Sequence, residues 1–402
     1  MEKPAQKPVY LDHAATTPVR PEVHARVSEV LTKGWGNPSS MHTRGRDAKA
    51  VLDEAREQLA AVLHVNFREI AFTSGGTEAD NLAVRGVLER WHDRGRHLVI
   101  SAIEHDAVIE TCRALEWAGN AEVTIVGCDD KGRIDPAQVA AAVRSDTILV
   151  SVMLVNNEVG TIQPVAEIAA EVKGRNRNTL IHTDAVQALG KVPVHPTELG
   201  ADLVSLSGHK VYGPKGAGAL YIRDGVFLSA QMTGGGQERG RRSGTENTPA
   251  IAGLGLAAFL AEKEREEFCQ RVEPLADSLR NLLEQQIPGL IWTGAGSQIP
   301  PFVTAIVPSV SSQLLLTALD ERGVYASGGS ACSSGAAQPS HVLTAMGFSA
   351  TQARSALRCA LGKDTTQEDI ASAASAIVEA WGRLTGQIAQ GTHHQAIPAS
   401  RA

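Results

Sequence analysis

The chain has 402 residues, of which 43% are hydrophobic and 20% are charged, and its formal net charge is −6. This composition is that of a globular protein with two or three domains, and it lacks the basic excess expected of a nucleic-acid-binding protein. No apolar run reaches the roughly 18 residues of a transmembrane helix, and residues 1–8 lack the apolar core of a signal peptide. The five cysteines form no C-x-x-C pair, which argues against a zinc site or a disulfide framework. We therefore expect a reduced, cytoplasmic protein with no metal and with neither nucleic acid nor membrane as a partner.

Between residues 70 and 222 the sequence predicts an alternation of strands and helices. Helical spacing of apolar residues predicts helices at 21–31, 46–63, 78–91 and 165–172. Short β-prone apolar runs predict strands at 69–73, 97–103, 123–126, 147–155, 180–183, 203–206 and 218–222. This alternation is typical of an α/β fold with a mainly parallel, seven-stranded sheet that is covered on both faces.

The C-terminal third has a different pattern. A charged helix over about 249–286 is expected to lead into a second, smaller α+β domain, which extends over 289–383. Within it, residues 353–361 are interpreted as a helical run that packs Cys359 into the core.

Unusual polar residues follow the predicted strands. Ligands of open α/β sheets bind beyond the carboxyl ends of the strands, so these residues are expected to share one edge. They are Thr77, His105, Asn157, Asp184, Gln187 and Lys210.

Lys210 and Asp184 together indicate pyridoxal 5'-phosphate (PLP). A single lysine after a strand is usually a surface residue, but a rigid, partly desolvated lysine suits Schiff-base chemistry. A carboxylate is needed to keep the ring nitrogen of this cofactor protonated, and Asp184 ends the preceding predicted strand. Gln187 is three residues further on and is a candidate donor to the ring hydroxyl. His105 is a candidate for ring stacking or acid–base work, although a structural histidine is the commoner case.

The phosphate of such a cofactor has candidate ligands in a strand–glycine–helix segment that contains Gly76 and Thr77. Such a segment directs free N–H groups at an anion, although a plain glycine turn with a helix cap has the same pattern. The segment matches neither the dinucleotide fingerprint nor Walker A. Ser207 and His209, beside Lys210, are further candidates for the phosphate.

Two loops have unusual compositions. Residues 234–247 are rich in glycine and arginine. This composition is typical of a solvated connector, or of a segment that brings donors to an anion in the same or a neighbouring subunit. Cys332 lies among glycine and serine in 327–336. It is either a reactive thiol on a mobile loop or an incidental linker cysteine.

With these motifs the chain resembles the cysteine desulfurases of the NifS/IscS type, in class V of the aminotransferase superfamily. The resemblance extends from Val9 to about Ile377. It rests on a set of motifs that are specific together and weak singly: Tyr10-Leu11-Asp12-His13-Ala14-Ala15-Thr16-Thr17-Pro18, Gly36-Asn37-Pro38-Ser39-Ser40, Thr73-Ser74-Gly75-Gly76-Thr77-Glu78, Asn156-Asn157-Glu158, His182-Thr183-Asp184-Ala185-Val186-Gln187, Ser207-Gly208-His209-Lys210, Arg242-Ser243-Gly244-Thr245-Glu246-Asn247 and Ser330-Ala331-Cys332.

The resemblance implies a role for each candidate residue. Lys210 would bind PLP covalently, Asp184 would contact its ring nitrogen, Gln187 its ring oxygen, and His105 would stack on the ring and move protons. Gly76, Thr77, Ser207 and His209 would hold the phosphate, with Thr245 entering from the partner subunit. Arg358 would clamp the substrate carboxylate with help from Asn37 and Asn157, and Asn157 would also contact the cofactor. Cys332 would accept the sulfur as a persulfide.

The resemblance also implies the organisation and the activity of the protein. It implies a PLP-dependent homodimer of fold type I, with a large domain at 16–262, a small domain made of 1–15 and 263–390, and a frayed tail at 391–402. The implied reaction converts L-cysteine to L-alanine and supplies sulfur to an acceptor protein such as an iron–sulfur scaffold. Selenocysteine lyase and class V aminotransferase are alternatives with the same fold. Cys332 argues against an aminotransferase, and the presence of Lys210 and Asp184 argues against an inactive binding scaffold.

Overall fold

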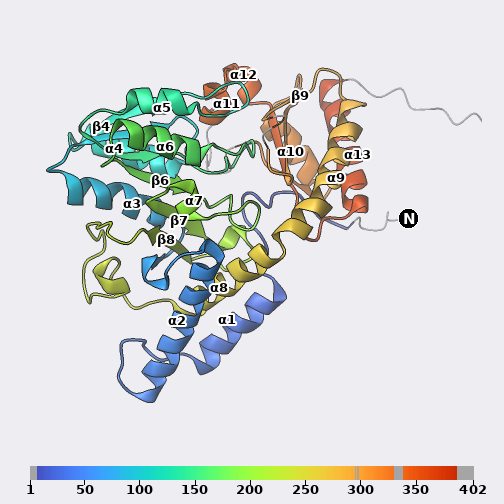
Figure 1. Cartoon of the computed structure of the whole chain (residues 1–402). Coiled ribbons are helices and arrows are strands. Elements are labelled where there is room, and N and C mark those ends of the chain that lie inside the picture. The colour runs from blue at the N-terminus through green and yellow to red at the C-terminus, as the bar shows by residue number, and fades with distance from the viewer. Residues whose placement is uncertain (1–6, 295, 297, 330–337, 387–402) are drawn as a thin grey trace, which may run out of the picture.

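The computed structural model describes residues 7–294, 296, 298–329 and 338–386. A seven-stranded sheet in the order β2-β8-β7-β6-β5-β3-β4 forms its centre (Figure 1). In this sheet β8 is antiparallel to both of its neighbours, whereas all the other pairings are parallel. The predicted mainly parallel sheet is therefore confirmed. Its strands are β2 (Ile70–Thr73), β3 (His97–Ser101), β4 (Glu122–Val126), β5 (Thr147–Ser151), β6 (Leu180–Asp184), β7 (Leu203–Ser207) and β8 (Gly218–Ile222).

Both faces of the sheet are covered, so its inner strands consist of buried residues only. Alternate residues of β3 show the two faces: Leu98 and Ile100 belong to the core beneath α3 and α4, and Val99 belongs to the core beneath α5 and α6. The covering helices are α3 (Gly76–Trp91), α4 (Asp106–Trp117), α5 (Pro136–Ala142), α6 (Val165–Arg175) and the short α7 (Pro196–Leu199).

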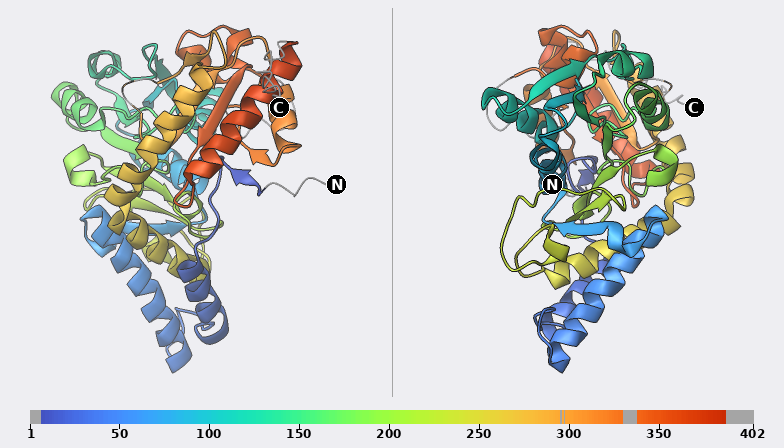
Figure 2. Two further views of the ribbon diagram at one scale, coloured as in Figure 1. Left: turned by 90° about the vertical axis from the view of Figure 1, so that its right-hand side faces the viewer. Right: turned by 60° about the vertical axis from the view of Figure 1, so that its left-hand side comes forward.

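Three further helices pack together beside the β2–β8–β7 side of the sheet. They are α1 (Pro21–Lys33), α2 (Thr43–Leu63) and α8 (Thr248–Lys263). The α1–α2 pair extends away from the body of the molecule (Figure 2), and the loop at 34–42 joins its two helices. None of the described helices is both long enough and apolar enough to cross a bilayer.

The C-terminal part forms a second core together with the first described residues. Val9 and Leu11 pack there against residues of α9 and α13, and β1 pairs in parallel with β11. A small antiparallel sheet has the order β12-β10-β9. The elements are β1 (Val9–Tyr10), α9 (Arg265–Glu284), β9 (Ile291–Trp292), β10 (Phe302–Ile306), α10 (Ser312–Asp320), β11 (Val324–Tyr325), α11 (His341–Ala345), α12 (Ala350–Ala353), β12 (Ala356–Ala360) and α13 (Gln367–Thr385).

Three predicted elements were wrong in this structure. The helix over 249–286 is two helices, because Glu264 leaves helical geometry with ψ near 0° and forms an ion pair with Arg20. The helical run over 353–361 contains the strand β12, whose five buried residues pair with β10. A short, fully buried apolar run has no periodicity that separates strand from helix. The strand over 147–155 ends at Ser151, and Val155 makes only an isolated bridge to Ile162.

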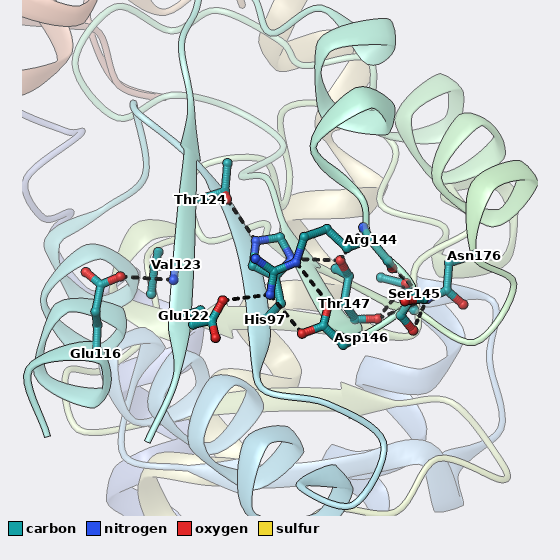
Figure 3. Close-up of polar contacts among 11 residues, drawn as sticks. His97, Glu116, Glu122, Val123, Thr124, Arg144, Ser145, Asp146, Thr147 and Asn176 are labelled. Carbon is teal, nitrogen blue, oxygen red and sulfur yellow. Dashed lines mark hydrogen bonds and ion pairs between the residues drawn. The ribbon is translucent and has the colours of Figure 1, made fainter. Parts of the chain in front are cut away.

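The amino-terminal edge of the sheet carries a paired polar cluster (Figure 3). The His97 ring lies between two threonine hydroxyls, with Nδ1 2.7 Å from Thr147 Oγ1 and Nε2 2.8 Å from Thr124 Oγ1. Beside it, Arg144 forms ion pairs at 2.8 Å with both Glu122 and Asp146. These contacts connect the starts of neighbouring strands.

Candidate active site

A cavity of about 240 Å³ lies at the carboxyl edge of the sheet, where the helix and loop connections begin. Ten of the residues predicted from the sequence line it, although they come from positions up to 282 residues apart: Gly76, Thr77, His105, Asn157, Asp184, Gln187, Ser207, His209, Lys210 and Arg358. Parallel strands place their carboxyl ends at one edge, which brings nine of these residues together. Arg358 comes from β12 in the smaller sheet.

Lys210 ends a 3-10 turn, η2 (Gly208–Lys210), which directly follows strand β7. Its Nζ donates to the carbonyl oxygens of Ala14 at 2.6 Å and Ala15 at 2.8 Å. Gln187 Nε2 donates to the same Ala14 oxygen at 2.8 Å. The N-terminal segment therefore holds the lysine amine at the cavity, and it links Lys210 to the turn after β6.

Asp184 ends β6 and is buried. Its Oδ1 accepts a hydrogen bond of 2.8 Å from the Val186 backbone N–H. Burial raises the pKa of Asp184, while the positive charges of His105 and Lys210 act in the opposite direction. A buried carboxylate in this position suits a partner that carries a proton on nitrogen.

His105 is the N-cap residue of α4, and its Nδ1 accepts a hydrogen bond of 3.1 Å from Ala107 N–H. The cap fixes the orientation of the ring, and the proton of a neutral His105 ring is then on Nε2. The imidazole thus has a defined tautomer where it lines the cavity.

The N-terminus of α3 forms another wall of the cavity. Its N-cap is Gly75, so no side chain caps the helix, and the first N–H groups of a helix have no acceptor within it. A Cβ at Gly76 would lie 2.8 Å from Val186 Cγ2, so only glycine leaves this space open. The His209 ring is beside Thr16 Oγ1 at 3.1 Å, and burial lowers the pKa of His209 to about 4. An anionic group fits this wall because free N–H groups and a helix dipole converge there.

Arg358 is fully buried in the middle of β12, where it reaches the cavity from the second core. Its Nη2 forms an ion pair with Asp12 Oδ1 at 2.8 Å, and its Nη1 donates to Asn157 O at 2.8 Å. Its Nε is buried without a hydrogen-bond partner among the described residues. The guanidinium is thus preorganised and keeps donor capacity for a carboxylate.

Two described residues among those predicted for the site, Asn37 and Thr245, do not line this cavity. Asn37 is exposed in the loop between α1 and α2, where its Oδ1 accepts from Ser39 N–H. Thr245 is exposed in the 234–247 loop, which is joined to α3 by the Arg242–Glu78 ion pair at 2.8 Å. Cys332 lies outside the described residues.

The structure also adds acidic residues that the sequence reasoning gave no role. Asp12 pairs with Arg358. Asp80 and Glu158 are buried and line the cavity, and Glu104 is buried nearby, with Oε1 accepting from Met153 N–H at 2.8 Å. A signal for Asp80 was present: it interrupts the apolar face of a predicted helix, three residues after Thr77.

The lysine amine, the buried carboxylate and the N-terminus of α3 thus lie around one cavity. Residues 9–372 match the family model described as aminotransferase class-V. The chain is 45% identical over 366 residues to the cysteine desulfurase IscS of Methanosarcina thermophila, covering 90% of this chain and 89% of that protein. It is 43% identical over 385 residues to a putative cysteine desulfurase IscS of Bacillus subtilis, covering 94% and 99%. A solved NifS-like protein aligns with a TM-score of 0.87 and 37% identity over 92% of this chain and 98% of that one.

The chain therefore belongs to the class V aminotransferase family and, within it, to the cysteine desulfurases of the IscS type. Membership of this family implies a PLP-dependent enzyme.

Proposed function

We propose that the protein removes the sulfur of L-cysteine, with PLP in the cavity and Cys332 as the first sulfur acceptor, and releases L-alanine. The observation that carries the proposal is the meeting of Lys210, Asp184 and Arg358 on one cavity. An amine, a buried carboxylate and a guanidinium match the aldehyde and ring nitrogen of PLP and the carboxylate of an amino acid. A solved structure of SspA in complex with cysteine is 35% identical to the chain, with a TM-score of 0.76, and covers 88% of this chain and 98% of that one.

The residues of the cavity fit PLP in kind. Lys210 would hold its aldehyde carbon, Asp184 its ring nitrogen, and Gln187 and His105 the ring itself. The phosphate would lie at the N-terminus of α3, with Gly76, Thr77, Ser207 and His209 around it. When bound there, the cofactor supplies an electron sink for the carbon atoms of the substrate.

The chain supplies orientation and proton transfer. Arg358 and Asn157 bind the substrate carboxylate, which fixes the amino acid relative to Lys210. The Lys210 amine accepts the α-proton of the substrate, and His105 holds a proton on Nε2.

Sulfur transfer requires a thiolate, which we assign to Cys332. Its Sγ attacks the substrate sulfur, so that an S–S bond forms and the substrate C–S bond breaks. The electron pair of that bond remains on carbon, which takes up a proton, and the products are L-alanine and a Cys332 persulfide. No external oxidant is needed. The persulfide then serves an acceptor protein such as an iron–sulfur scaffold.

The proposal is tested by replacing the thiol. In Cys332→Ser, alanine formation from cysteine should collapse because a hydroxyl is neither ionised nor soft enough to attack sulfur. Binding of PLP and the change in its absorbance on addition of cysteine should persist. Mass spectrometry of wild-type protein treated with cysteine and an alkylating agent should find the persulfide on Cys332.

Cys128→Ser is the matched control. Cys128 is partly exposed, but burial raises the pKa of its thiol to about 11, so this variant should turn over cysteine as the wild type does. Full activity of Cys332→Ser on cysteine would overturn the assignment of the acceptor. Activity on selenocysteine alone would agree with it, because the weaker carbon–selenium bond needs less help from a thiol.

We also propose a homodimer with shared sites, in which Thr245 and Asn37 serve the cavity of the partner subunit. Both residues are exposed and lie outside the cavity of their own chain. Mixed Lys210→Ala and Thr245→Ala subunits should regain activity, because one hybrid site then has both residues intact. If subunit exchange is verified and no activity returns, the site is not shared.

A further inference from the structure

A second buried carboxyl group, that of Asp80, lines the cavity together with Asp184. Asp80 is on the buried face of α3 with 1% of its surface exposed, and it lines the same cavity as Asp184. Its Oδ1 has no hydrogen-bond partner among the described residues. A buried carboxyl oxygen without a hydrogen-bond partner is costly, and it is most costly when the group is ionised. The hydrogen bond between the Asp80 side chain and Ser205 lowers the pKa of Asp80, but burial is the larger effect and raises it.

The polar groups around Asp80 connect it to Asp184 through the sheet. Ser205 on β7 is opposite Asp184 on β6 in the strand register, and its Oγ is 3.0 Å from His182 Nε2. His182 Nε2 is 3.6 Å from Asp80 Oδ1, and its Nδ1 is 2.8 Å from Ser151 Oγ. All of these side chains are buried.

The His182 ring cannot balance the charge of Asp80. Burial lowers the pKa of His182 to about 3, so the ring is neutral. The other ionisable groups that act on Asp80 are Asp184 and Glu104, both acids. The positive charges of His105 and Lys210 act on Asp184 instead. Two buried carboxyl groups with so little compensation cannot both be ionised.

We propose that Asp80 is a positioning residue that stays protonated behind Asp184, so that the cavity floor presents a single negative charge to the ring nitrogen of the cofactor. This role rests on the proposed function, because it concerns the group that Asp184 faces. Asp184 is the ionised member of the pair, since the Val186 N–H and the nearby Lys210 ammonium favour its carboxylate.

The proposal predicts a pH dependence of stability with a definite sign. Burial, and then the charge of Asp184, raises the pKa of Asp80 well above its usual range. The folded state therefore keeps a proton that the unfolded state loses near pH 4. The contribution of Asp80 to the free energy of unfolding is therefore fully present below that pH. It is lost as the pH rises towards the pKa of Asp80 in the folded state.

The first experiment uses the full chain without cofactor. The melting temperature of Asp80→Asn should rise relative to wild type between pH 5 and pH 8, by about 3 °C, because asparagine keeps the shape of the protonated acid and cannot ionise. Asp202→Asn is the matched control: Asp202 is also buried, but it accepts from Lys173 at 2.9 Å and from Arg223 at 2.6 Å. This control should lower the melting temperature at both pH values.

A difference in melting temperature between Asp80→Asn and wild type that does not change from pH 5 to pH 8 overturns the proposal, because Asp80 would then be ionised in the folded state as it is in the unfolded state. If Asp80→Asn does not fold, Asp80→Ser, which is also uncharged, takes its place in the same comparison.

The second experiment follows the absorbance of bound PLP as a function of pH. Wild-type protein should show an alkaline spectral change when Asp80 loses its proton, and Asp80→Asn should lack it. An unchanged titration in the variant would show that Asp80 does not act on the ring nitrogen. If wild-type protein binds no PLP at all, the proposed function fails, whereas the stability result on the protonated acid stands.

Discussion

The two edges of the central sheet differ in how their buried polar groups are hydrogen-bonded. At the amino edge, His97 has a threonine hydroxyl at each ring nitrogen (Figure 3), and Asp202 accepts from Lys173, Arg223 and the Ile181 N–H. At the carboxyl edge, several buried side chains each have one oxygen atom without a hydrogen-bond partner among the described residues. These atoms are Asp80 Oδ1, Glu104 Oε2, Glu158 Oε1 and Gln187 Oε1.

The difference shows what each edge does. A satisfied polar network contributes to stability and specifies how the strands pair. An unsatisfied buried group costs free energy, and such groups gather where a ligand or a proton can supply the missing partner. Variants at matched residues of the two edges should therefore separate activity from stability.

The largest difference between activity and stability is expected for Lys210 at the carboxyl edge and Lys173 at the amino edge. Lys210→Ala should reduce turnover by at least roughly 10³-fold, because it removes both the covalent attachment and the proton carrier. Its unfolding free energy without cofactor should change little. Lys173→Ala at the amino edge should keep its activity. Its unfolding free energy should fall by about 1–3 kcal/mol, because Asp202 loses an ion-pair partner. Cysteine turnover and denaturant unfolding measure the two properties, and a reversal of the pattern would contradict the comparison.

His105 at the carboxyl edge and His97 at the amino edge should show the same separation of activity from stability, with smaller effects. His105→Ala should reduce turnover by about 10²-fold and cost about 1 kcal/mol through loss of the helix cap. His97→Ala should leave turnover near the wild-type value and cost about 2–4 kcal/mol, since two threonine hydroxyls lose their partner in a buried site. Equal losses of activity in both variants would show that His105 has only a structural role.

The smallest effect concerns pH. Burial raises the pKa of Glu104 to about 8, so the folded state keeps a proton, and its stabilising effect is lost as the pH rises from about 4.5 to about 8. Burial lowers the pKa of His97, so the pH dependence of its contribution to stability has the opposite sign. This contribution comes from the neutral ring and is lost as the pH falls below about 6.5. Denaturant midpoints measured at pH 5, 7 and 9 should show that the stability of Glu104→Gln relative to wild type increases as the pH rises. A constant difference would contradict the burial argument for Glu104.

The carboxyl-edge residues were predictable because they depend on local patterns and on one rule of topology. Strand-forming runs, each followed by a polar turn, place Asp184 and Lys210 at strand ends whatever the details of packing. Parallel pairing then brings those ends together. Nine of the predicted site residues line the cavity for this reason.

Arg358 shows where local pattern fails. Residues 353–361 have no period that distinguishes helix from strand, and their conformation follows from pairing with β10, more than 50 residues earlier. The ion pair of Arg358 with Asp12 joins residues 346 positions apart. Glu264, at the break between α8 and α9, is similarly paired with Arg20, 244 residues away, and no local rule identifies such partners.

The sequence by itself determined the fold class, the chemistry of the cavity and most of its residues, because periodicity, turn residues and the types of functional groups are local properties. Only the tertiary structure decided which charges are paired and which are buried alone. Packing between distant segments pairs Arg358 with Asp12 and places Asn37 and Thr245 away from the cavity of their own chain. It also brings Asp80 into the same cavity as Asp184. Burial and the nearness of other charges set the energy of a polar group, and both depend on what the rest of the chain places around it.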